Sequence, residues 1–409
     1  MLTIVIGAGP SGLCAAFSSA NENNQVIVIE KNNKVGKKLF ITGKGRCNVT
    51  NNCSNQQFID NVVNNKQFLY SSISNFNPSD TISLFNELNV ELITERGNRV
   101  FPKSNHAYDI SDALKRKCVS SGVKFHLNEE VISIEKEDEH FILKTNRNIY
   151  YPDFVVIATG GKSYPLTGST GDGYRFASFF NHQIIEPVPG LVGLKIKEEV
   201  NNNLNGFTLK NVTLTARYEG KKISEFGELT FYQNYLDGAI SITISSLINR
   251  IKEPIQLEID LKPALSENQL LNRINKEINE HPLEPISKII KGMTSSRFYD
   301  FFVNKIDFDI NDKCIYFSNE KKFKLINLLK HFPLTYLGLM GFDRAIITSG
   351  GISTKQINAK TMESKIVPSL FFVGEVIDVD AFTGGFNIQI AISTGIAAGK
   401  YINQITNYL

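Results

Sequence analysis

The first thirty residues hold the pattern that most restricts the fold. The apolar run "LTIVI" at positions 2–6 leads into the turn "GAGPSG", and the small and apolar residues of "LCAAFSSA" follow it. A second apolar run, "QVIVIE", covers positions 25–30 and ends in an acid. A buried strand, a turn, a helix and another strand make a βαβ unit, which requires a parallel sheet covered by helices. The sequence therefore predicts an α/β fold.

Gly7, Gly9 and Gly12 have the spacing of a dinucleotide-binding turn. The first permits the tight turn, the second lets the backbone approach a pyrophosphate, and the third lets helix and strand pack closely. The phosphates would then lie at the helix N-terminus. Glu30 would accept hydrogen bonds from the adenosine ribose, and its charge disfavours the 2′-phosphate of NADP. The alternative is a glycine turn in a plain α/β sheet.

Two later segments favour FAD over NAD. The strand "VVIATGG" runs into Thr159 and Gly160, and "SLFFVGEVI" runs into Gly374 and Glu375. After it, the glycines of "TGGFN" open a helix at 385–388. A cofactor touched by the start, middle and end of the chain must be long, as FAD is. Glu375 would hold the ribityl hydroxyls, and the helix start would face N1 and the C2 carbonyl of the flavin, stabilising negative charge there.

The stretch "TGKGRCNVTN" at positions 42–51 and its lysine-rich flank carry no acid. They follow Glu30 directly, so we expect them to cross the pyrophosphate toward the flavin. Lys38 and Arg46 would neutralise phosphate, while glycines 43 and 45 and the Asn48 and Asn51 amides would line the polar edge of the cofactor. The alternative is a solvated basic loop.

The middle of the chain differs in character from both ends. Residues 191–262 and 318–344 are rich in strand patterns, whereas 263–317 is amphipathic and helical. We therefore predict a discontinuous FAD-binding domain at 1–190 and 345–409. A β-rich inserted domain (191–262 and 318–344) and a helical inserted domain (263–317) would interrupt it.

Composition restricts the partners. The 409 residues contain 44 Lys and Arg against 41 Asp and Glu, a net charge of +3, which gives no global reason to expect nucleic acid or a membrane. The five cysteines form no Cys-x-x-Cys, the histidines lack metal-ligand spacing, and no apolar run is long enough to span a bilayer. We expect a cytoplasmic protein without a metal that acts on a small molecule. The oligomeric state stays open.

Longer motifs carry a family resemblance. "GKKLFITGKGRCNVTN", "RVFPKSNHAYDI", "ATGGKSYPLTGSTGDGY" and "TMESKIVPSLFFVGEVIDVDAFTGGFNIQ" resemble, in this order, the bacterial flavoproteins that include BaiN-type bile-acid intermediate reductases and aminoacetone oxidases. A weaker similarity extends to succinate dehydrogenase and fumarate reductase flavoprotein subunits. The resemblance implies non-covalent FAD in a two-part, Rossmann-like domain of the glutathione-reductase type, with β-barrel-like and helical insertions.

The expected cofactor-lining residues come from five separated segments. They are Gly7, Gly9, Pro10, Ser11, Gly12, Glu30, Lys31, Lys38, Gly43, Gly45, Arg46, Cys47, Asn48, Val131, Thr159, Gly160, Gly374, Glu375, Asp380, Gly385, Phe386, Asn387 and Ile388. One loop departs from the family pattern: Gln233 replaces a histidine and Ala239 a proline. Glutamine is no general base near neutral pH, so a known family substrate should not be transferred.

Some residues keep alternative interpretations. Cys47, beside a cation, would be either a redox partner of the flavin or a small packed thiol. Tyr164, Tyr232 and Tyr235 would line a substrate cavity or simply pack. No catalytic residue is assigned.

We expect an FAD-dependent oxidoreductase that moves a hydride between a small organic substrate and flavin N5. No second strand–glycine–helix unit follows, so we expect no separate NAD(P)H domain. The family resemblance favours a reductase in which NAD(P)H visits the flavin through the substrate cleft. Alternatively, oxygen reoxidises the flavin of an oxidase of small amines or ketones. A non-enzymatic flavin-binding redox sensor or RNA-associated module is the alternative from another class.

Overall fold

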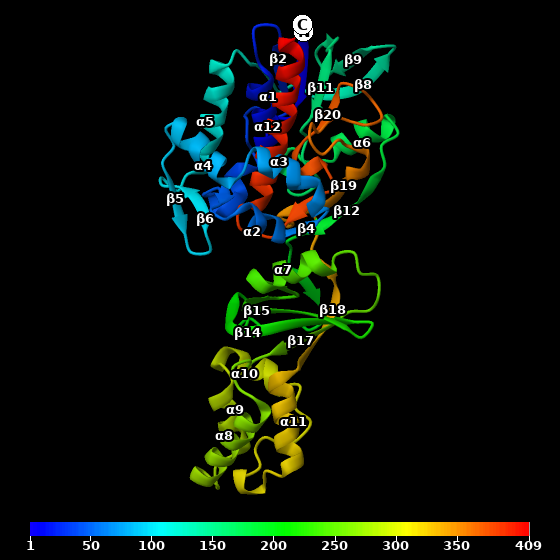
Figure 1. The fold of residues 1–409 in the computed structure, drawn as a ribbon. Coiled ribbons are helices and arrows are strands. Elements are labelled where there is room, and N and C mark those ends of the chain that lie inside the picture. The colour runs from blue at the N-terminus through cyan, green and yellow to red at the C-terminus, as the bar shows by residue number, and fades with distance from the viewer. Residues whose placement is uncertain (409) are drawn as a thin grey trace. The chain divides into compact units, whose positions relative to one another are not determined.

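The computed structural model describes residues 1–408, which form two compact units (Figure 1). Met1–Gly190 and the chain from Phe342 on make the first unit, and Leu191–Gly341 makes the second. The first holds a parallel sheet, and the second holds a closed barrel with helices. The expected Rossmann-like fold with barrel-like and helical insertions is confirmed. The predicted boundaries of three domains stay a prediction.

A five-stranded sheet organises the first unit, in the order β20-β11-β1-β2-β7. The strands are β1 (Leu2–Ile6), β2 (Gln25–Glu30), β7 (Lys124–Leu127), β11 (Phe154–Ile157) and β20 (Leu370–Phe372). Every neighbouring pair is parallel, and Ile4 of β1 is in register with Val155 and Ile27. All residues of β11 are buried, because other elements cover both faces of the sheet.

Helix α1 (Pro10–Ser19) packs against α12 (Phe386–Asn407) and α5 (Ala107–Ser120) (Figure 1). Gly395 and Gly399 allow the close approach of α12. A Cβ atom at Gly395 would lie 2.3 Å from the Ser11 carbonyl oxygen, and one at Gly399 would lie 2.5 Å from that of Ala15. Because Ser11 lies opposite Gly395 and Ala15 lies opposite Gly399, the two helices run side by side in the same direction.

Smaller elements surround the sheet. The helices are α2 (Asn55–Asp60), α3 (Tyr70–Asn75), α4 (Pro78–Glu87) and α6 (Asp172–Phe179). The strand groups are β8 (Val131–Glu137), β9 (His140–Thr145) and β10 (Ile149–Tyr150); β3 (Thr50–Asn51), β5 (Leu92–Glu95) and β6 (Arg99–Pro102); β4 (Val62–Asn64) with β21 (Asp380–Ala381); and β12 (Ile184–Gly190) with β19 (Ile347–Ile352). The strands of each group pair antiparallel. The pairs β4–β21 and β12–β19 join segments far apart in the sequence, whereas β8, β9 and β10 follow one another along the chain.

The second unit is built on a closed six-stranded barrel, in the order β13-β16-β15-β14-β17-β18. The strands are β13 (Leu194–Ile196), β14 (Phe207–Tyr218), β15 (Lys221–Tyr232), β16 (Tyr235–Asp237), β17 (Gln256–Asp260) and β18 (Phe332–Leu339). Burial alternates along them because inward and outward positions alternate in a barrel. Helix α7 (Ala239–Ile248) follows β16.

Four helices complete the second unit: α8 (Glu267–Glu280), α9 (Ile286–Met293), α10 (Ser296–Val303) and α11 (Asn319–Lys330). Ser266 caps α8 in a capping box with Gln269. Phe298 and Phe302 of α10 contact Phe332 of β18, at centroid distances of 5.2 and 5.7 Å. The helices and the barrel therefore share one hydrophobic core.

Candidate functional site

The ends of four parallel strands meet at the N-terminus of α1. The Gly7 N–H donates to the Ile29 carbonyl at 2.8 Å, and the Ala158 N–H donates to the Ile6 carbonyl at 2.9 Å. The Val373 N–H extends the same edge by donating to Ile157 at 3.1 Å. Ligands of open α/β sheets bind outside the carboxyl ends of the strands. The three segments expected to touch FAD therefore lie together at this edge.

The three glycines have the geometry that the phosphate-binding turn requires. Gly7 has a φ of +104°, in the region that favours glycine. A Cβ at Gly12 would lie 2.0 Å from the Gly7 carbonyl oxygen, so only glycine permits this contact between helix and turn. A Cβ at Gly9, in contrast, would meet no atom within 4 Å. The backbone at Gly9 therefore faces open space beside a helix N-terminus that no side chain caps, which fits a diphosphate.

Glu30 lies beside this turn with a fixed orientation. Its Oε2 accepts from the Ala8 N–H at 2.8 Å, and its Oε1 accepts from the backbone N–H and side-chain amide of Asn32 at 2.8 and 2.7 Å. Lys31 turns away toward Asp172, with Nζ 2.6 Å from Oδ2. Val131 is buried at the start of β8. The carboxylate of Glu30 stands where an adenosine ribose would bind, and this role stays a prediction.

Lys38 and Glu375 form an ion pair that the sequence did not reveal. Lys38 Nζ lies 2.7 Å from Glu375 Oε2 and 2.5 Å from Ser163 Oγ. Glu375 Oε1 accepts from Ser163 Oγ at 2.8 Å and from the Thr348 N–H at 2.7 Å. Both charged side chains are mostly buried, at 21% and 23% exposure. The pair ties four distant segments together at the ends of β11, β19 and β20.

Arg46 also has a carboxylate partner. Its guanidinium contacts Glu95, donates to Asn105 Oδ1 at 2.7 Å and lies 4.1 Å from the centroid of the Phe101 ring. The hydrogen bond from Arg46 lowers the pKa of Glu95. Neutralisation of phosphate by Lys38 and Arg46 therefore stays a prediction, since each cation already pairs with an acid.

The loop between these cations has an unusual backbone. Gly43, Lys44, Gly45 and Cys47 all have φ between +55° and +86°. Successive residues of this kind turn backbone N–H groups toward one side, an arrangement that suits anions. The Oδ1 of Asn48, next in the chain, is buried and accepts no hydrogen bond within residues 1–408. A buried acceptor of this kind fits a ligand donor such as a ring N–H.

Two more polar atoms near the strand ends are buried without a protein partner in the described chain: Thr159 Oγ1 and the hydroxyl of Tyr174. A side chain larger than that of glycine does not fit at position 160, because a Cβ there would lie 2.9 Å from Ser169 Oγ. Orphaned groups at Asn48 and Thr159 fall on residues expected to line FAD. The donor set, the open glycine turn and these orphaned atoms together fit that cofactor.

Cys47 is a packed thiol. It is fully buried, and burial raises its pKa to about 12 although Thr42 hydrogen bonds to it. Burial also raises the pKa of the half-buried Cys53. A protonated, inaccessible thiol is a poor nucleophile. The structure therefore favours packing over a redox role for Cys47.

The start of α12 contacts the loop that follows Arg46. A Cβ at Gly385, whose φ is +99°, would lie 2.3 Å from the Thr50 carbonyl oxygen. The Asn387 side chain closes the preceding turn, accepting from the Ala381 N–H at 3.0 Å and donating to the Ala381 carbonyl at 2.7 Å. No side chain caps this helix, so the backbone N–H groups of Phe386 and Ile388 remain at its positive end.

Asparagines from β4 and the next turn position the buried Asp378 and Asp380. Asn64 Nδ2 donates to Asp380 Oδ1 at 2.7 Å, and Ser349 Oγ donates to the same atom at 3.1 Å. Asn65 Nδ2 donates to Asp378 Oδ2 at 2.9 Å. The sequence carried no signal for these asparagines, because β4 is three residues long and its partner β21 lies more than 300 residues away.

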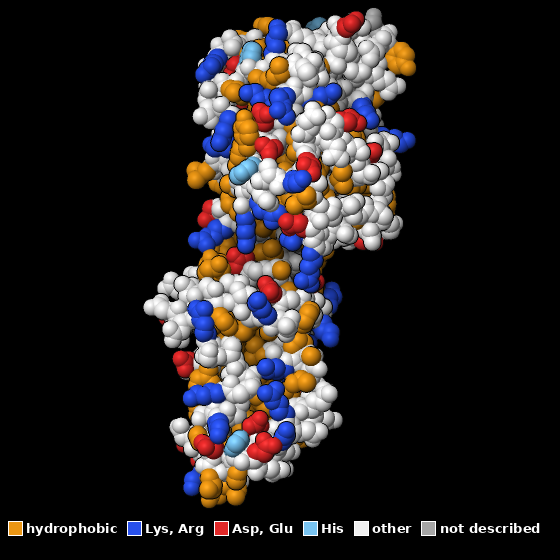
Figure 2. All heavy atoms as spheres, turned by 90° about the vertical axis from the view of Figure 1, so that its left-hand side faces the viewer, with side chains coloured by type: hydrophobic (Ala, Val, Ile, Leu, Met, Phe, Trp, Pro, Cys, Tyr) orange, Lys and Arg blue, Asp and Glu red, His pale blue; other side chains and the backbone are white. Residues whose placement is uncertain are grey.

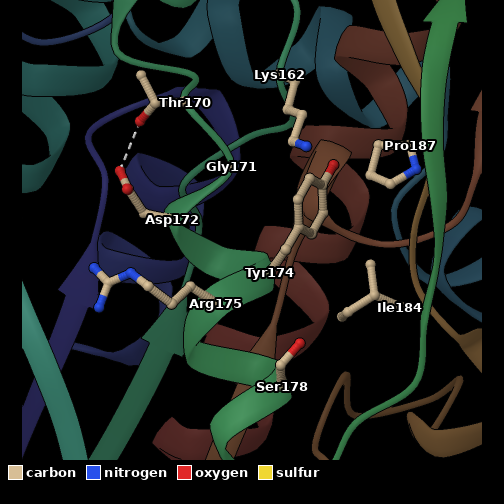
Figure 3. Close-up of a pocket in the computed structure, with 9 residues that line it drawn as sticks. All are labelled: Lys162, Thr170, Gly171, Asp172, Tyr174, Arg175, Ser178, Ile184 and Pro187. Carbon is tan, nitrogen blue, oxygen red and sulfur yellow. Dashed lines mark hydrogen bonds between the residues drawn. The ribbon is translucent and has the colours of Figure 1, made fainter.

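An open cavity of about 420 Å³ lies beside α6 (Figure 3). Lys162, Asp172, Tyr174 and Ile184 are among its lining residues. Burial, with the carboxylates of Glu375 and Asp378, raises the pKa of Tyr174 far above its usual value. Its hydroxyl is therefore a permanent donor. Residues 1–408 contain neither a cluster of side chains suited to a metal nor a helix able to cross a membrane.

Known proteins resemble this chain along its whole length. The family description "HI0933-like protein Rossmann domain" matches residues 1–401. The ribosomal RNA dihydrouridine synthase of Haemophilus influenzae is 30% identical over 409 residues, 98% of each chain. The 3-dehydro-bile acid delta(4,6)-reductase of Clostridium scindens is 26% identical over 404 residues, 97% of each chain. A FrdA subunit of Escherichia coli quinol fumarate reductase has the same fold, with a TM-score of 0.52 and 14% identity over 100% of this chain and 71% of FrdA.

Proposed function

This chain belongs to the HI0933-like family and is an FAD-dependent oxidoreductase, and we propose that it reduces a carbon–carbon double bond of uridine in ribosomal RNA. Its electron donor would be NAD(P)H. The observation that carries this proposal is the similarity to the Haemophilus influenzae relative, which spans nearly all of both chains. We make the proposal although Gln233 and Ala239 depart from the family pattern, because two substitutions in one loop weigh less than a similarity of this extent.

The names of the two relatives share one kind of chemistry. Dihydrouridine is uridine with two hydrogen atoms added across the 5,6 double bond of the base, which is conjugated to a carbonyl group. The name delta(4,6)-reductase refers to double bonds of a 3-dehydro bile acid, which also carries a carbonyl group. Addition of hydrogen to an electron-poor double bond is therefore the reaction class that both names support.

FAD, when bound, supplies a hydride at ring N5, and the protein supplies binding, orientation and electrostatics. Gly9 and the N-terminus of α1 would hold the diphosphate, and Glu30 would hold the ribose. Glu375, oriented by Lys38 and Ser163, would accept from the ribityl hydroxyls. The uncapped N-terminus of α12 would stabilise negative charge at one end of the ring.

NAD(P)H is proposed as the donor because the Clostridium scindens relative is named a reductase, and a reduction needs an electron source. The sequence contains one strand–glycine–helix unit, which FAD would occupy, so the nicotinamide would have no domain of its own. A nicotinamide would reach the ring from the substrate side and leave before the substrate binds. Both NAD(P)H and ribosomal RNA occur in the cytoplasm, which is where we propose that the protein acts.

The small net charge of +3 does not exclude an RNA substrate. Figure 2 shows Lys and Arg interspersed with Asp and Glu on the face that it presents. Such a surface would contact few phosphates, and its RNA affinity would depend on contacts with bases. Recognition of a particular unpaired uridine is consistent with this balance.

The test uses the FAD-loaded protein, NADPH or NADH, and ribosomal RNA transcribed in vitro, which carries no modifications. After anaerobic incubation, the RNA is digested and its nucleosides are analysed by mass spectrometry. We expect dihydrouridine to appear only when protein, nicotinamide and RNA are all present. Its absence, together with flavin that nicotinamide does reduce, would contradict the choice of substrate.

A small conjugated ketone is the second candidate substrate, and the similarity to the Clostridium scindens reductase favours it. Oxidation of NADPH that depends on added enone, with RNA left unchanged, would support it. Hydrogen peroxide formed at the rate of substrate loss would instead indicate an oxidase.

A further inference from the structure

The turn between β15 and β16 carries two stacked tyrosines on the outside of the barrel. The rings of Tyr232 and Tyr235 lie 4.7 Å apart between centroids, with only 10° between their planes. These residues are cross-strand partners, and their neighbours Phe231 and Leu236 are fully buried inside the barrel. Because inward and outward positions alternate, the tyrosines point outward and are only half-buried. The tyrosine rings therefore lie outside the barrel interior, with that of Tyr235 against the backbone at Gly193.

The two turn residues between the tyrosines, Gln233 and Asn234, carry exposed side-chain amides. The backbone carbonyls of Gln233 and Asn234 accept from the N–H groups of Val200 and Ile196, each at 3.0 Å, which holds the turn in place. Their side-chain amides make no hydrogen bond within residues 1–408. A side-chain amide offers one donor and one acceptor side by side. This pair can bond to the N3–H and O4 edge of uracil and, with the amide turned over, equally to the N3 and amino group of cytosine.

Cations flank the stacked rings on the neighbouring strand. Lys195 of β13 is the cross-strand partner of Tyr235, and Lys197 follows two positions later; both are exposed. Glu198, the residue after Lys197, bonds to other groups: it lies 3.2 Å from Lys305 and accepts from the Thr335 N–H at 3.0 Å. Glu198 therefore does not cancel the two lysines.

We propose that these residues form a nucleobase platform that binds an unpaired uridine of the RNA substrate. The platform comprises Tyr232, Gln233, Asn234 and Tyr235, with Lys195 and Lys197 beside it. A base stacks on the tyrosine pair, the side-chain amides hydrogen-bond to the edge of that base, and the lysines contact neighbouring phosphates. This inference rests on the proposed function and adds to it the surface by which the RNA is recognised.

The test measures binding of a labelled, unstructured oligouridylate to the FAD-loaded protein by fluorescence anisotropy. Loss of one stacking partner costs about 1–3 kcal/mol per base, so Tyr232→Ala and Tyr235→Ala should each weaken binding about tenfold. Tyr232→Phe keeps the ring and should bind as the wild type does. Phe226→Ala, on the same strand and 62% exposed, is the matched control and should also leave binding unchanged.

Two further readouts do not depend on removal of a tyrosine. Gln233→Ala changes only an exposed turn residue, and it should weaken binding of oligouridylate and oligocytidylate alike. With two phosphate contacts, the logarithm of affinity should fall with the logarithm of salt with a slope of about −1.4. A slope several times steeper would show that a different, strongly basic surface binds the RNA.

The outcomes separate this inference from the proposed function. If the wild type forms dihydrouridine but both alanine variants bind oligouridylate and react as the wild type does, the platform is wrong and the function stands. If binding depends on the tyrosines but no dihydrouridine forms, the platform stands as an RNA site and the reaction is wrong. If the wild type does not bind oligouridylate, the platform is wrong whatever the reaction.

Discussion

Replacement of Gly9 and Gly12 by alanine should separate cofactor binding from folding. A Cβ at Gly9 would meet no atom within 4 Å, and its φ of −79° and ψ of 178° suit alanine. The free energy of unfolding of the apoprotein should therefore fall by less than about 1 kcal/mol, the cost of a poorer helix cap. The methyl group would stand where the diphosphate must approach the backbone. We expect the dissociation constant for FAD to rise at least tenfold, about 1.4 kcal/mol.

Gly12→Ala should instead lower the stability of the apoprotein. Its Cβ would lie 2.0 Å from the Gly7 carbonyl oxygen and 3.1 Å from the Ala158 Cβ, so the helix must move away from the sheet. Such overpacking costs about 1–3 kcal/mol, and the apoprotein should be destabilised before any cofactor is added.

Urea unfolding of the apoproteins and calorimetric titration with FAD measure the two quantities. The chain has no tryptophan, so circular dichroism should follow the unfolding. Wild-type FAD affinity in Gly9→Ala would refute the placement of the diphosphate against this residue. An unaltered stability of Gly12→Ala would refute the packing argument.

Three further predictions concern charged and thiol groups. Lys38→Met and Glu375→Gln should each destabilise the apoprotein, by about 1–3 kcal/mol, and the double variant should lose less than the sum in urea unfolding, because the pair at 2.7 Å is mostly buried. In the native protein at mildly alkaline pH, iodoacetamide should label Cys53 and leave Cys47 unmodified by mass spectrometry, since burial raises the pKa of Cys47 to about 12; equal labelling would contradict this burial. Burial acts to raise the pKa of Glu129, but hydrogen bonds from neighbouring hydroxyl groups outweigh it and lower the pKa. The resulting stability is present above the ordinary carboxyl pKa and lost as pH falls through the lower, folded value, so Glu129→Gln should flatten the acid limb of the unfolding curve against pH.

The sequence predicted the fold and the glycine turn between β1 and α1 because their signals are local. The apolar runs of β1 and β2, and the glycines between them, lie within thirty residues. A β-rich and a helical insertion were also expected, from alternation and from the amphipathic pattern of 263–317, whereas the barrel-like form was implied by the family resemblance. Each of these features depends on residues a few positions apart.

The contacts of the charged groups could not be predicted in this way. Lys38 was expected to meet phosphate, yet its nearest acid is Glu375, 337 residues along the chain. Arg46 was also expected to neutralise phosphate. It pairs instead with Glu95 of the antiparallel pair β5–β6, which the sequence did not suggest. The choice of ion-pair partner depends on tertiary packing, which no local pattern encodes.

The roles of Tyr232 and Tyr235 also could not be predicted from local sequence patterns. Sequence alone left lining and packing equally open for them, because an aromatic residue in a strand suits either role. Only the closed barrel shows that both rings stack on its outer surface while Phe231 and Leu236 fill the interior.

The most direct measurement is an anaerobic absorption experiment with the FAD-loaded protein in two steps. NADPH or NADH in stoichiometric amount should bleach the flavin bands. Unmodified ribosomal RNA should then restore them, with one dihydrouridine formed for each flavin reoxidised. Bands that nicotinamide bleaches but RNA leaves bleached, while a conjugated ketone restores them, would contradict an RNA substrate. Bands that neither nucleotide bleaches would contradict the proposed nicotinamide-linked reduction itself.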